Sequence, residues 1–277
     1  MGLGRRECLV EIAARMRGEV VEHHANLLRL RIVDVDQVSH ALGKLERSAL
    51  LGDLDVPPGP MRIEENEDAD WTTDLATFID MVKAREPGLP VFLLGHSAGG
   101  VIACGYTLEH QDEIAGLICE DFAYQVPAPD IALAIVKGVS YVAPHAHVFK
   151  LKNEDFSRDP AVVAAMNADP LIANESQPSE TMAEMVRADQ LLKKSFGQFT
   201  LPLLILHGTA DKVTKPSGSK EFYEKAGSND KTLKLYEGHF HDLLADVGKQ
   251  QVMADIQAWI DAHIGTEIPR SRRELRT

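Results

Sequence analysis

The stretch VFLLGHSAGG, residues 91–100, decides the fold of this chain. Its first four residues form a short apolar run, which is typical of a buried parallel strand. The residues after it have the spacing of a buried helix. Between the two, residues 95–99 match the pattern G-x-S-x-G, in which glycines let a strand and a helix approach closely around a sharp turn. We predict that this turn holds Ser97 in a strained backbone with its hydroxyl group accessible.

Strand and helix patterns alternate on both sides of this turn. We expect strands at 27–36, 91–94, 116–120, 203–206 and 231–236, and helical patterns at 75–82, 101–108 and 252–264. Such alternation indicates an α/β fold, with a mainly parallel sheet flanked by helices. Residues 123–199 differ, because prolines divide them into short helical patterns. They indicate an insertion over the core and not a continuation of the sheet.

Composition narrows the classes of function. The net charge of −13 disfavours nucleic acid as a partner, because phosphate binding needs a basic surface. Cys8, Cys104 and Cys119 are too few for a disulfide framework, and no apolar stretch reaches 18 residues. The N-terminus lacks the apolar block of a secretory signal. We therefore expect a cytoplasmic protein, and the sequence leaves its oligomeric state open.

A serine hydroxyl becomes a good nucleophile only beside a base, and that base needs an acid to orient it. Residues 206–211, LHGTAD, place Asp211 after a buried strand, and residues 236–242, YEGHFHD, place two histidines after the next one. Because parallel strands end at one edge of the sheet, we expect both loops to lie near Ser97. Either His241 or His239 would be the base. Asp211 is the favoured acid, although it also suits a structural role in the turn, and Asp121 is a less favoured substitute.

At this point the chain resembles a known family. From Trp71 to Ile264 it is similar to α/β-hydrolases of the monoacylglycerol lipase type, which are grouped with serine aminopeptidase-like hydrolases. The resemblance rests on EPGLPVFLLGHSAGG (86–100), SRDP (157–160), ADPL (168–171) and LPLLILHGTAD (201–211), with the family's Gly-x-x-His ending at 238–241. It implies an α/β-hydrolase fold with Ser97 as nucleophile, Asp211 as acid and His241 as base. His207 is then a structural hydrogen-bonding residue beside Asp211.

The resemblance also implies a cap and an oxyanion hole. The cap would shape an acyl pocket with Ile131, Ile135 and Val136, although the same residues also suit a core helix that touches no ligand. The backbone N–H of Ala98 would be one oxyanion donor. The family's second donor comes from an early His-Gly turn, but no His-Gly pair precedes residue 95, and residues 22–25, EHHA, lack the glycine. The second donor therefore stays unassigned.

These features divide the chain into five segments. They are a divergent N-terminal segment (1–70), a first part of the core (71–123), a cap (124–199), a second part of the core (200–264) and a charged tail (265–277). The N-terminal segment would hold the early strands of the core, either all of them or an incomplete set.

The leading hypothesis is a serine hydrolase without a cofactor that cleaves carboxylic esters, either monoacylglycerols or short- to medium-chain acyl esters, through an acyl-serine intermediate. Its main partner would be the small-molecule ester. Peripheral contact of the cap with lipid is a second expected interaction that the sequence leaves open. Three alternatives stay open: an impaired or non-catalytic homologue, an amide or peptide hydrolase, and a metal-dependent hydrolase. The last would use the H-x-H pairs at His145 and His147 and at His239 and His241.

Overall fold

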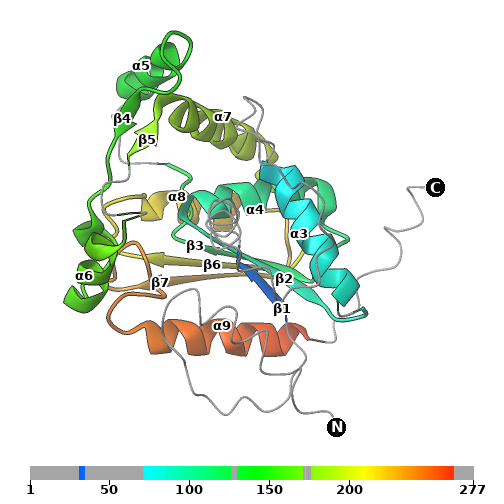
Figure 1. Cartoon of the computed structure of the whole chain (residues 1–277). Coiled ribbons are helices and arrows are strands. Elements are labelled where there is room, and N and C mark those ends of the chain that lie inside the picture. The colour runs from blue at the N-terminus through cyan, green and yellow to red at the C-terminus, as the bar shows by residue number, and fades with distance from the viewer. Residues whose placement is uncertain are drawn as a thin grey trace. The chain divides into compact units, whose positions relative to one another are not determined.

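The computed structural model describes residues 31–34, 71–85, 87–125, 130–170, 172 and 176–264. Within them, five parallel strands form the main sheet in the order β1-β2-β3-β6-β7 (Figure 1). The strands are β1 (Arg31–Asp34), β2 (Val91–His96), β3 (Gly116–Glu120), β6 (Leu203–Gly208) and β7 (Lys231–Tyr236). The predicted parallel α/β sheet is thus confirmed, and β1 lies inside the alternating run at 27–36. Other predictions for the first 70 residues lie outside the described part.

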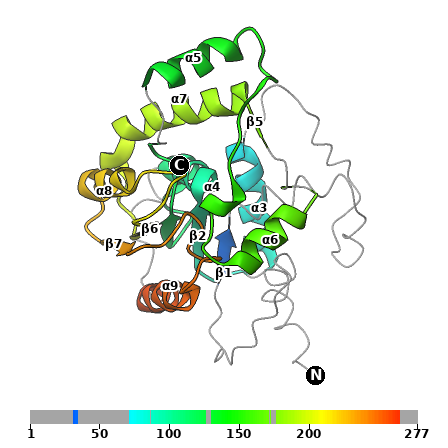
Figure 2. The same cartoon turned by 90° about the vertical axis from the view of Figure 1, so that its left-hand side faces the viewer.

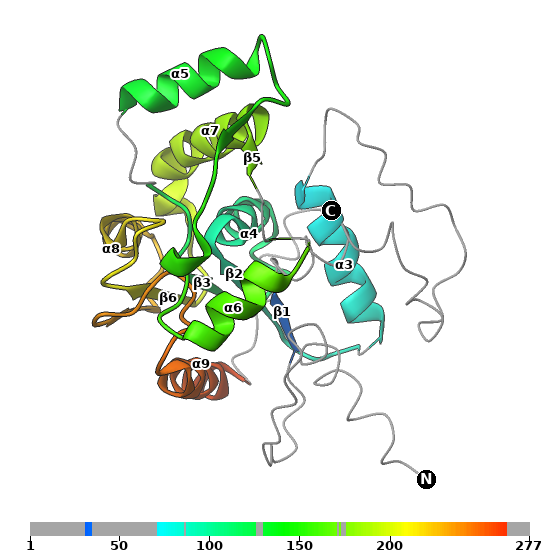
Figure 3. The same ribbon diagram turned by 60° about the vertical axis from the view of Figure 1, so that its left-hand side comes forward.

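Helices cover both faces of the sheet, as the apolar strands require. On one face lie α3 (Trp71–Arg85), α4 (Ser97–His110) and α8 (Pro216–Lys225), and on the other lies α9 (Lys249–His263) (Figures 1 and 3). All residues of β3 and β6 are buried, as are the first five of β2. On the α9 side, the ring of Trp259 meets that of Phe92 edge to face, with 5.8 Å between centroids. The central strands are therefore shielded from water by helices on both sides.

A long insertion separates two strands that are neighbours in the sheet. Leu117 of β3 lies opposite Leu203 of β6, and everything from α5 to η3 falls between them in the sequence. The insertion contains α5 (Asp130–Ser140), β4 (His147–Phe149), η2 (Asn153–Asp155), α6 (Pro160–Ala168), β5 (Gln177–Pro178), α7 (Ser179–Ser195) and η3 (Phe196–Gln198). Helix α7 lies between α5 and α4 (Figure 2). The chain thus leaves the main sheet after β3 and returns to it at β6.

An aromatic cluster joins the end of the insertion to the core. The ring of Phe222 in α8 lies 4.6 Å from Phe196, 5.1 Å from Phe199 and 5.3 Å from Phe122, measured between centroids. All four side chains are buried. Because aromatic side chains bury large apolar areas, this cluster fixes the far end of α7 onto the sheet.

The close packing of α4 on the sheet depends on Gly100. A Cβ atom added there would lie 2.3 Å from the Cβ of Phe122. We expect Gly100→Ala to lower the free energy of unfolding by about 1–3 kcal/mol, the usual cost of overpacking a core. Urea unfolding measures this change. Gly138→Ala in α5 is the matched control, because a Cβ there meets no atom within 4 Å. Equal stability of Gly100→Ala and the unchanged protein would contradict the prediction.

None of the described helices combines the length and the apolar character that crossing a membrane demands.

Candidate active site

Ser97 occupies the sharp turn between β2 and α4. Its φ angle is +51°, in the left-handed region that L-residues rarely adopt, so the predicted strain at this turn is confirmed. A Cβ on Gly95 would lie 2.5 Å from the carbonyl oxygen of Gly99. Glycine is therefore required before the serine as well as at position 100. The turn places the Ser97 hydroxyl at the carboxyl end of β2, at the start of α4.

Asp211 lies in the loop after β6 and is held by its own loop. Its Oδ1 accepts hydrogen bonds from the backbone N–H groups of Val213 (2.7 Å) and Thr214 (3.0 Å), and its Oδ2 accepts one from Thr214 Oγ1 (2.6 Å). Burial by itself would raise the pKa of this carboxyl group. The hydrogen bonds from His207, His241 and Thr214 outweigh burial and hold the pKa well below its usual range. Asp211 is therefore a carboxylate with a fixed orientation.

His241 joins the two preceding residues. Its Nδ1 lies 2.8 Å from Asp211 Oδ2, and its Nε2 lies 2.8 Å from Ser97 Oγ. The carboxylate accepts only, so we assign the ring proton to Nδ1, which leaves Nε2 free to accept the serine proton. Burial lowers the pKa of His241 below 6.5, while the hydrogen bond to Asp211 acts in the opposite direction. The imidazole is therefore a neutral base at pH 7.

The other histidine of the loop points elsewhere. His239 Nδ1 lies 3.7 Å from Asp246 Oδ2, and its ring lies near Gly248. Of the two histidines that the residues alone left open, the structure places His241 beside Ser97. Gly238, at the start of the Gly-x-x-His ending, has a φ of +71°, which glycine adopts without cost.

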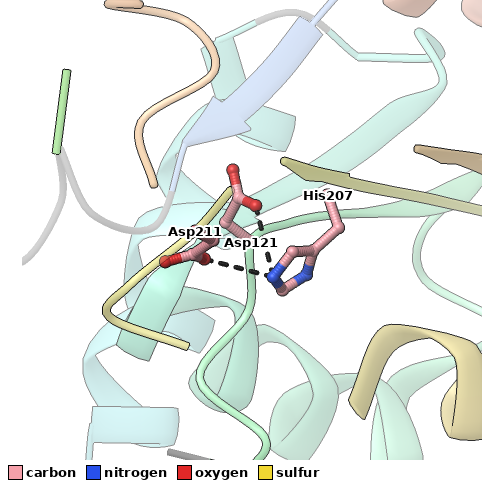
Figure 4. Close-up of side chains that lie close together, drawn as sticks. All are labelled: Asp121, His207 and Asp211. Carbon is pink, nitrogen blue, oxygen red and sulfur yellow. Dashed lines mark ion pairs between the residues drawn. The ribbon is translucent and has the colours of Figure 1, made fainter. Parts of the chain in front are cut away.

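Asp121 and His207 lie close to Asp211 (Figure 4). His207 Nε2 lies 3.1 Å from Asp211 Oδ2 and 3.5 Å from Asp121 Oδ1, and its Nδ1 lies 2.7 Å from Ser219 Oγ. This is the supporting place predicted for His207. Burial raises the pKa of Asp121 well above its ordinary value, and the carboxyl groups of Glu120 and Asp211 raise it further. The pKa values of these two neighbouring carboxyl groups are thus shifted in opposite directions, downward for Asp211 and upward for Asp121.

The same three side chains form a group that could hold a metal ion, since their ligand atoms lie within 4.8 Å of one another. However, Asp211 Oδ2 is already close to Thr214, His207 and His241. Neither of the H-x-H pairs considered from the sequence forms this cluster. His147 Nδ1 instead lies 2.8 Å from the carbonyl oxygen of Ser176.

A second buried carboxyl group beside the site was not anticipated from the sequence. Glu120 ends β3 with its side chain fully buried, and its Oε2 lies 3.1 Å from His96 Nδ1. Its Oε1 accepts the backbone N–H of Leu244 at 3.2 Å. The ring of His96 lies 4.8 Å from that of His241. Glu120 therefore links the turn at Ser97 to the loop after β7 that holds His241. In the sequence, the only sign of this role is a pair of acidic residues at the end of an apolar strand.

The remaining predicted site residues have separate places. Ala98, the second residue of α4, is exposed. In α5, Ile135 is 61% exposed and Val136 is half-buried, whereas the side chain of Ile131 lies outside the described part.

Several known proteins resemble this chain in sequence and in fold. The sequence model of the family described as serine aminopeptidase, S33, matches residues 58–248. The monoacylglycerol lipase of Mycolicibacterium smegmatis is 29% identical over 210 residues, which cover 74% of each chain. Human monoglyceride lipase is 30% identical over 201 residues, which cover 71% of this chain and 66% of that protein. The crystal structure of the monoacylglycerol lipase of Paleococcus ferrophilus has a TM-score of 0.62 and 26% identity, over 69% of this chain and 76% of that one.

The family match covers well over half of the chain and includes Ser97, Asp211 and His241. The match begins at residue 58, whereas the resemblance that the motifs carry begins at Trp71. With the parallel sheet and its flanking helices, this chain belongs to the serine aminopeptidase S33 family of α/β-hydrolases.

Proposed function

We propose that this chain is a carboxylic ester hydrolase that works through an acyl-Ser97 intermediate. The observation that carries the proposal is the continuous chain from Asp211 through His241 to Ser97, with 2.8 Å at each step. Such a chain makes a serine hydroxyl reactive at neutral pH, because the imidazole accepts its proton as the oxygen attacks. The two relatives described above are named as lipases of monoacylglycerols, which are esters.

The proposed reaction has two halves. In the first, Ser97 Oγ attacks the ester carbonyl carbon while His241 Nε2 takes the hydroxyl proton. The tetrahedral intermediate then collapses, and His241 gives that proton to the departing alcohol. In the second half, His241 takes a proton from water as the water oxygen attacks the acyl-enzyme. Collapse returns the proton to Ser97 and releases the carboxylic acid. Asp211 stabilises the imidazolium that forms in each half.

Negative charge on the carbonyl oxygen needs donors. We propose the backbone N–H of Ala98 as one of them, because it lies at the start of α4, where helix N–H groups point outward and favour an anion. The second donor stays unassigned. Losing one such donor costs on the order of 10²–10³ in turnover, so the catalytic rate depends on whether a second donor is present.

We further propose that residues 124–199 form a cap over a core made of 71–123 and 200–264, with 1–70 as a divergent segment and 265–277 as a tail. Ile131, Ile135 and Val136 would provide apolar surface for the acyl chain. The exposed apolar side chains of this part also support peripheral lipid contact. They include Tyr141 at 76% and Val142 at 87% exposure, next to the end of α5.

A cytoplasmic location is a proposal as well. Cys104 and Cys119 are free thiols whose sulfur atoms lie 3.7 Å apart in the core, which suits a reducing compartment.

A substrate panel tests the proposed class of reaction. We expect the purified chain to hydrolyse p-nitrophenyl esters and monoacylglycerols with rates that depend on acyl length, and to leave aminoacyl p-nitroanilides intact. A chelator should have no effect, and a fluorophosphonate should abolish turnover. Turnover that survives the fluorophosphonate but is lost with the chelator would favour a metal-dependent route. Exclusive cleavage of the anilides would make the chain an amide hydrolase.

A further inference from the structure

Asp246 is a buried carboxylate in the histidine loop that the proposed reaction does not use. Its side chain is fully buried. Its Oδ2 accepts the backbone N–H of Phe240 at 2.9 Å, one residue before His241. Burial by itself would raise the pKa of this carboxyl group, but the hydrogen bonds from the backbone of Phe240 and from Arg158 hold it below its ordinary value. The carboxylate therefore stays charged inside the protein and needs a cationic partner.

That partner comes from the insertion. Arg158 donates to Asp246 twice, from its backbone N–H to Oδ1 at 2.7 Å and from Nε to Oδ2 at 2.8 Å. Its Nη2 also donates to the carbonyl oxygen of Val247. Arg158 belongs to the SRDP segment at 157–160, which carries part of the family resemblance but has no place in the reaction. The ion pair thus fastens a segment of the insertion to the histidine loop.

Neighbouring residues of the two segments reinforce this contact. The hydroxyl of Ser157 donates to the carbonyl oxygen of Ala245 at 3.0 Å, and the backbone N–H of Asp242 donates to the carbonyl oxygen of Phe156 at 2.8 Å. The ring of Phe156 meets the imidazole of His241 edge to face, with 5.1 Å between centroids. Residues 156–158 therefore contact Asp242 and the ring of His241 directly, and they reach Phe240 through Asp246.

We propose that Arg158 is a positioning residue for His241. Through Asp246 and the N–H of Phe240 it keeps the imidazole aligned with Ser97, so the insertion sets the geometry of the base as well as covering the core. This inference rests on the proposed function, in which His241 is the base. Misplacement of a reacting group by about 1 Å can cost a hundredfold in rate, which sets the scale of the effect.

The test compares Arg158→Ala with Asp159→Asn. Asp159 is the matched control, because its Oδ1 accepts the N–H of Ala161 at the start of α6, and asparagine caps a helix equally well. For Arg158→Ala we expect kcat to fall about 10- to 100-fold with KM little changed, since a step of the chemistry and not substrate binding is affected. The rate of fluorophosphonate labelling of Ser97 should fall by the same factor. Asp159→Asn should match the unchanged protein in both measurements.

Chemical rescue separates positioning from general damage to the fold. The side chain of Arg158 is 31% exposed, so a guanidinium ion from solution can reach the vacated place. Millimolar guanidinium, far below denaturing concentrations, should restore part of kcat in Arg158→Ala and leave the other proteins unaffected. If circular dichroism shows that Arg158→Ala does not fold, Arg158→Gln, which keeps much of the side-chain length without the charge, takes its place in the same measurements.

Several results would overturn the inference. They are unchanged kcat and labelling in the Arg158 variant, a loss confined to KM, an equal loss in Asp159→Asn, or no rescue by guanidinium. Each can be recognised while the unchanged protein is still labelled at Ser97 and active. Absence of labelling and activity in the unchanged protein would instead refute the proposed function itself.

Discussion

Ser97→Ala should abolish ester hydrolysis, with kcat falling by about a millionfold, the scale seen when a serine nucleophile is removed from such a group. The reason is that the attacking oxygen, Ser97 Oγ, lies 2.8 Å from His241 Nε2, and the alanine side chain has no oxygen to take its place. The measurement is the rate of p-nitrophenol release at saturating ester, with the uncatalysed rate subtracted. Alanine, like serine, lacks a favourable left-handed conformation, so the turn keeps its strain and stability should change little.

Ser217→Ala is the matched control for this substitution. Ser217 is an exposed serine at the start of α8, and its hydroxyl donates to Gln125 Oε1 at 3.0 Å. Its loss should leave kcat within a factor of two, since surface substitutions away from a site have small effects. Full activity in Ser97→Ala would show that the nucleophile lies elsewhere.

Asp211→Asn should have the second largest effect, a fall in kcat of about 10⁴-fold, because an amide can stabilise the wrong tautomer of the imidazole and cannot balance its positive charge. Asp121→Asn should cost far less. Asp121 Oδ1 accepts the backbone N–H of Gly208 at 2.7 Å, a bond that an amide oxygen also accepts, and burial raises the pKa of this carboxyl group. Steady-state kinetics of the two variants distinguish the acids. A larger loss in Asp121→Asn would reverse the assignment.

The pH profile provides a second measurement on the same pair. The neutral form of His241 is the active one, so kcat/KM is lost as the pH falls through its pKa. Burial lowers that pKa, and we expect the acid limb below pH 6.5. The hydrogen bond that His241 donates to Asp211 raises the pKa of His241, and its loss in Asp211→Asn should move the acid limb lower still. Movement of the limb to higher pH in this variant would contradict the described electrostatics.

Local patterns in the sequence predicted the sheet and the three chemical loops. The apolar strands, the glycines around Ser97, and the loops that hold Asp211 and His241 each carry their own signal within about ten residues. Parallel strands then bring the loops to one edge, whatever their separation in the sequence. For this reason Ser97 and His241 could be predicted as neighbours although the whole insertion lies between them.

The supporting contacts could not be predicted in this way. Arg158 and Asp246 are far apart in the sequence, and nothing in either segment alone reveals that they pair. The same holds for Glu120 and His96, which meet only because β2 and β3 are neighbours with His96 opposite Glu120. Such pairings follow from tertiary packing and not from local patterns. Ile135 and Val136 of α5 show a similar limit, because the apolar character of a residue does not determine the direction in which its side chain points.

The central claim is that Ser97 is activated by His241 and becomes acylated. Its most direct test is peptide mapping by mass spectrometry after brief treatment with an alkyl fluorophosphonate. We predict one phosphonyl group per chain, on Ser97, with labelling that requires His241 and is lost in His241→Ala. A phosphonyl group on another residue, or labelling of Ser97 at the same rate without His241, would contradict the claim.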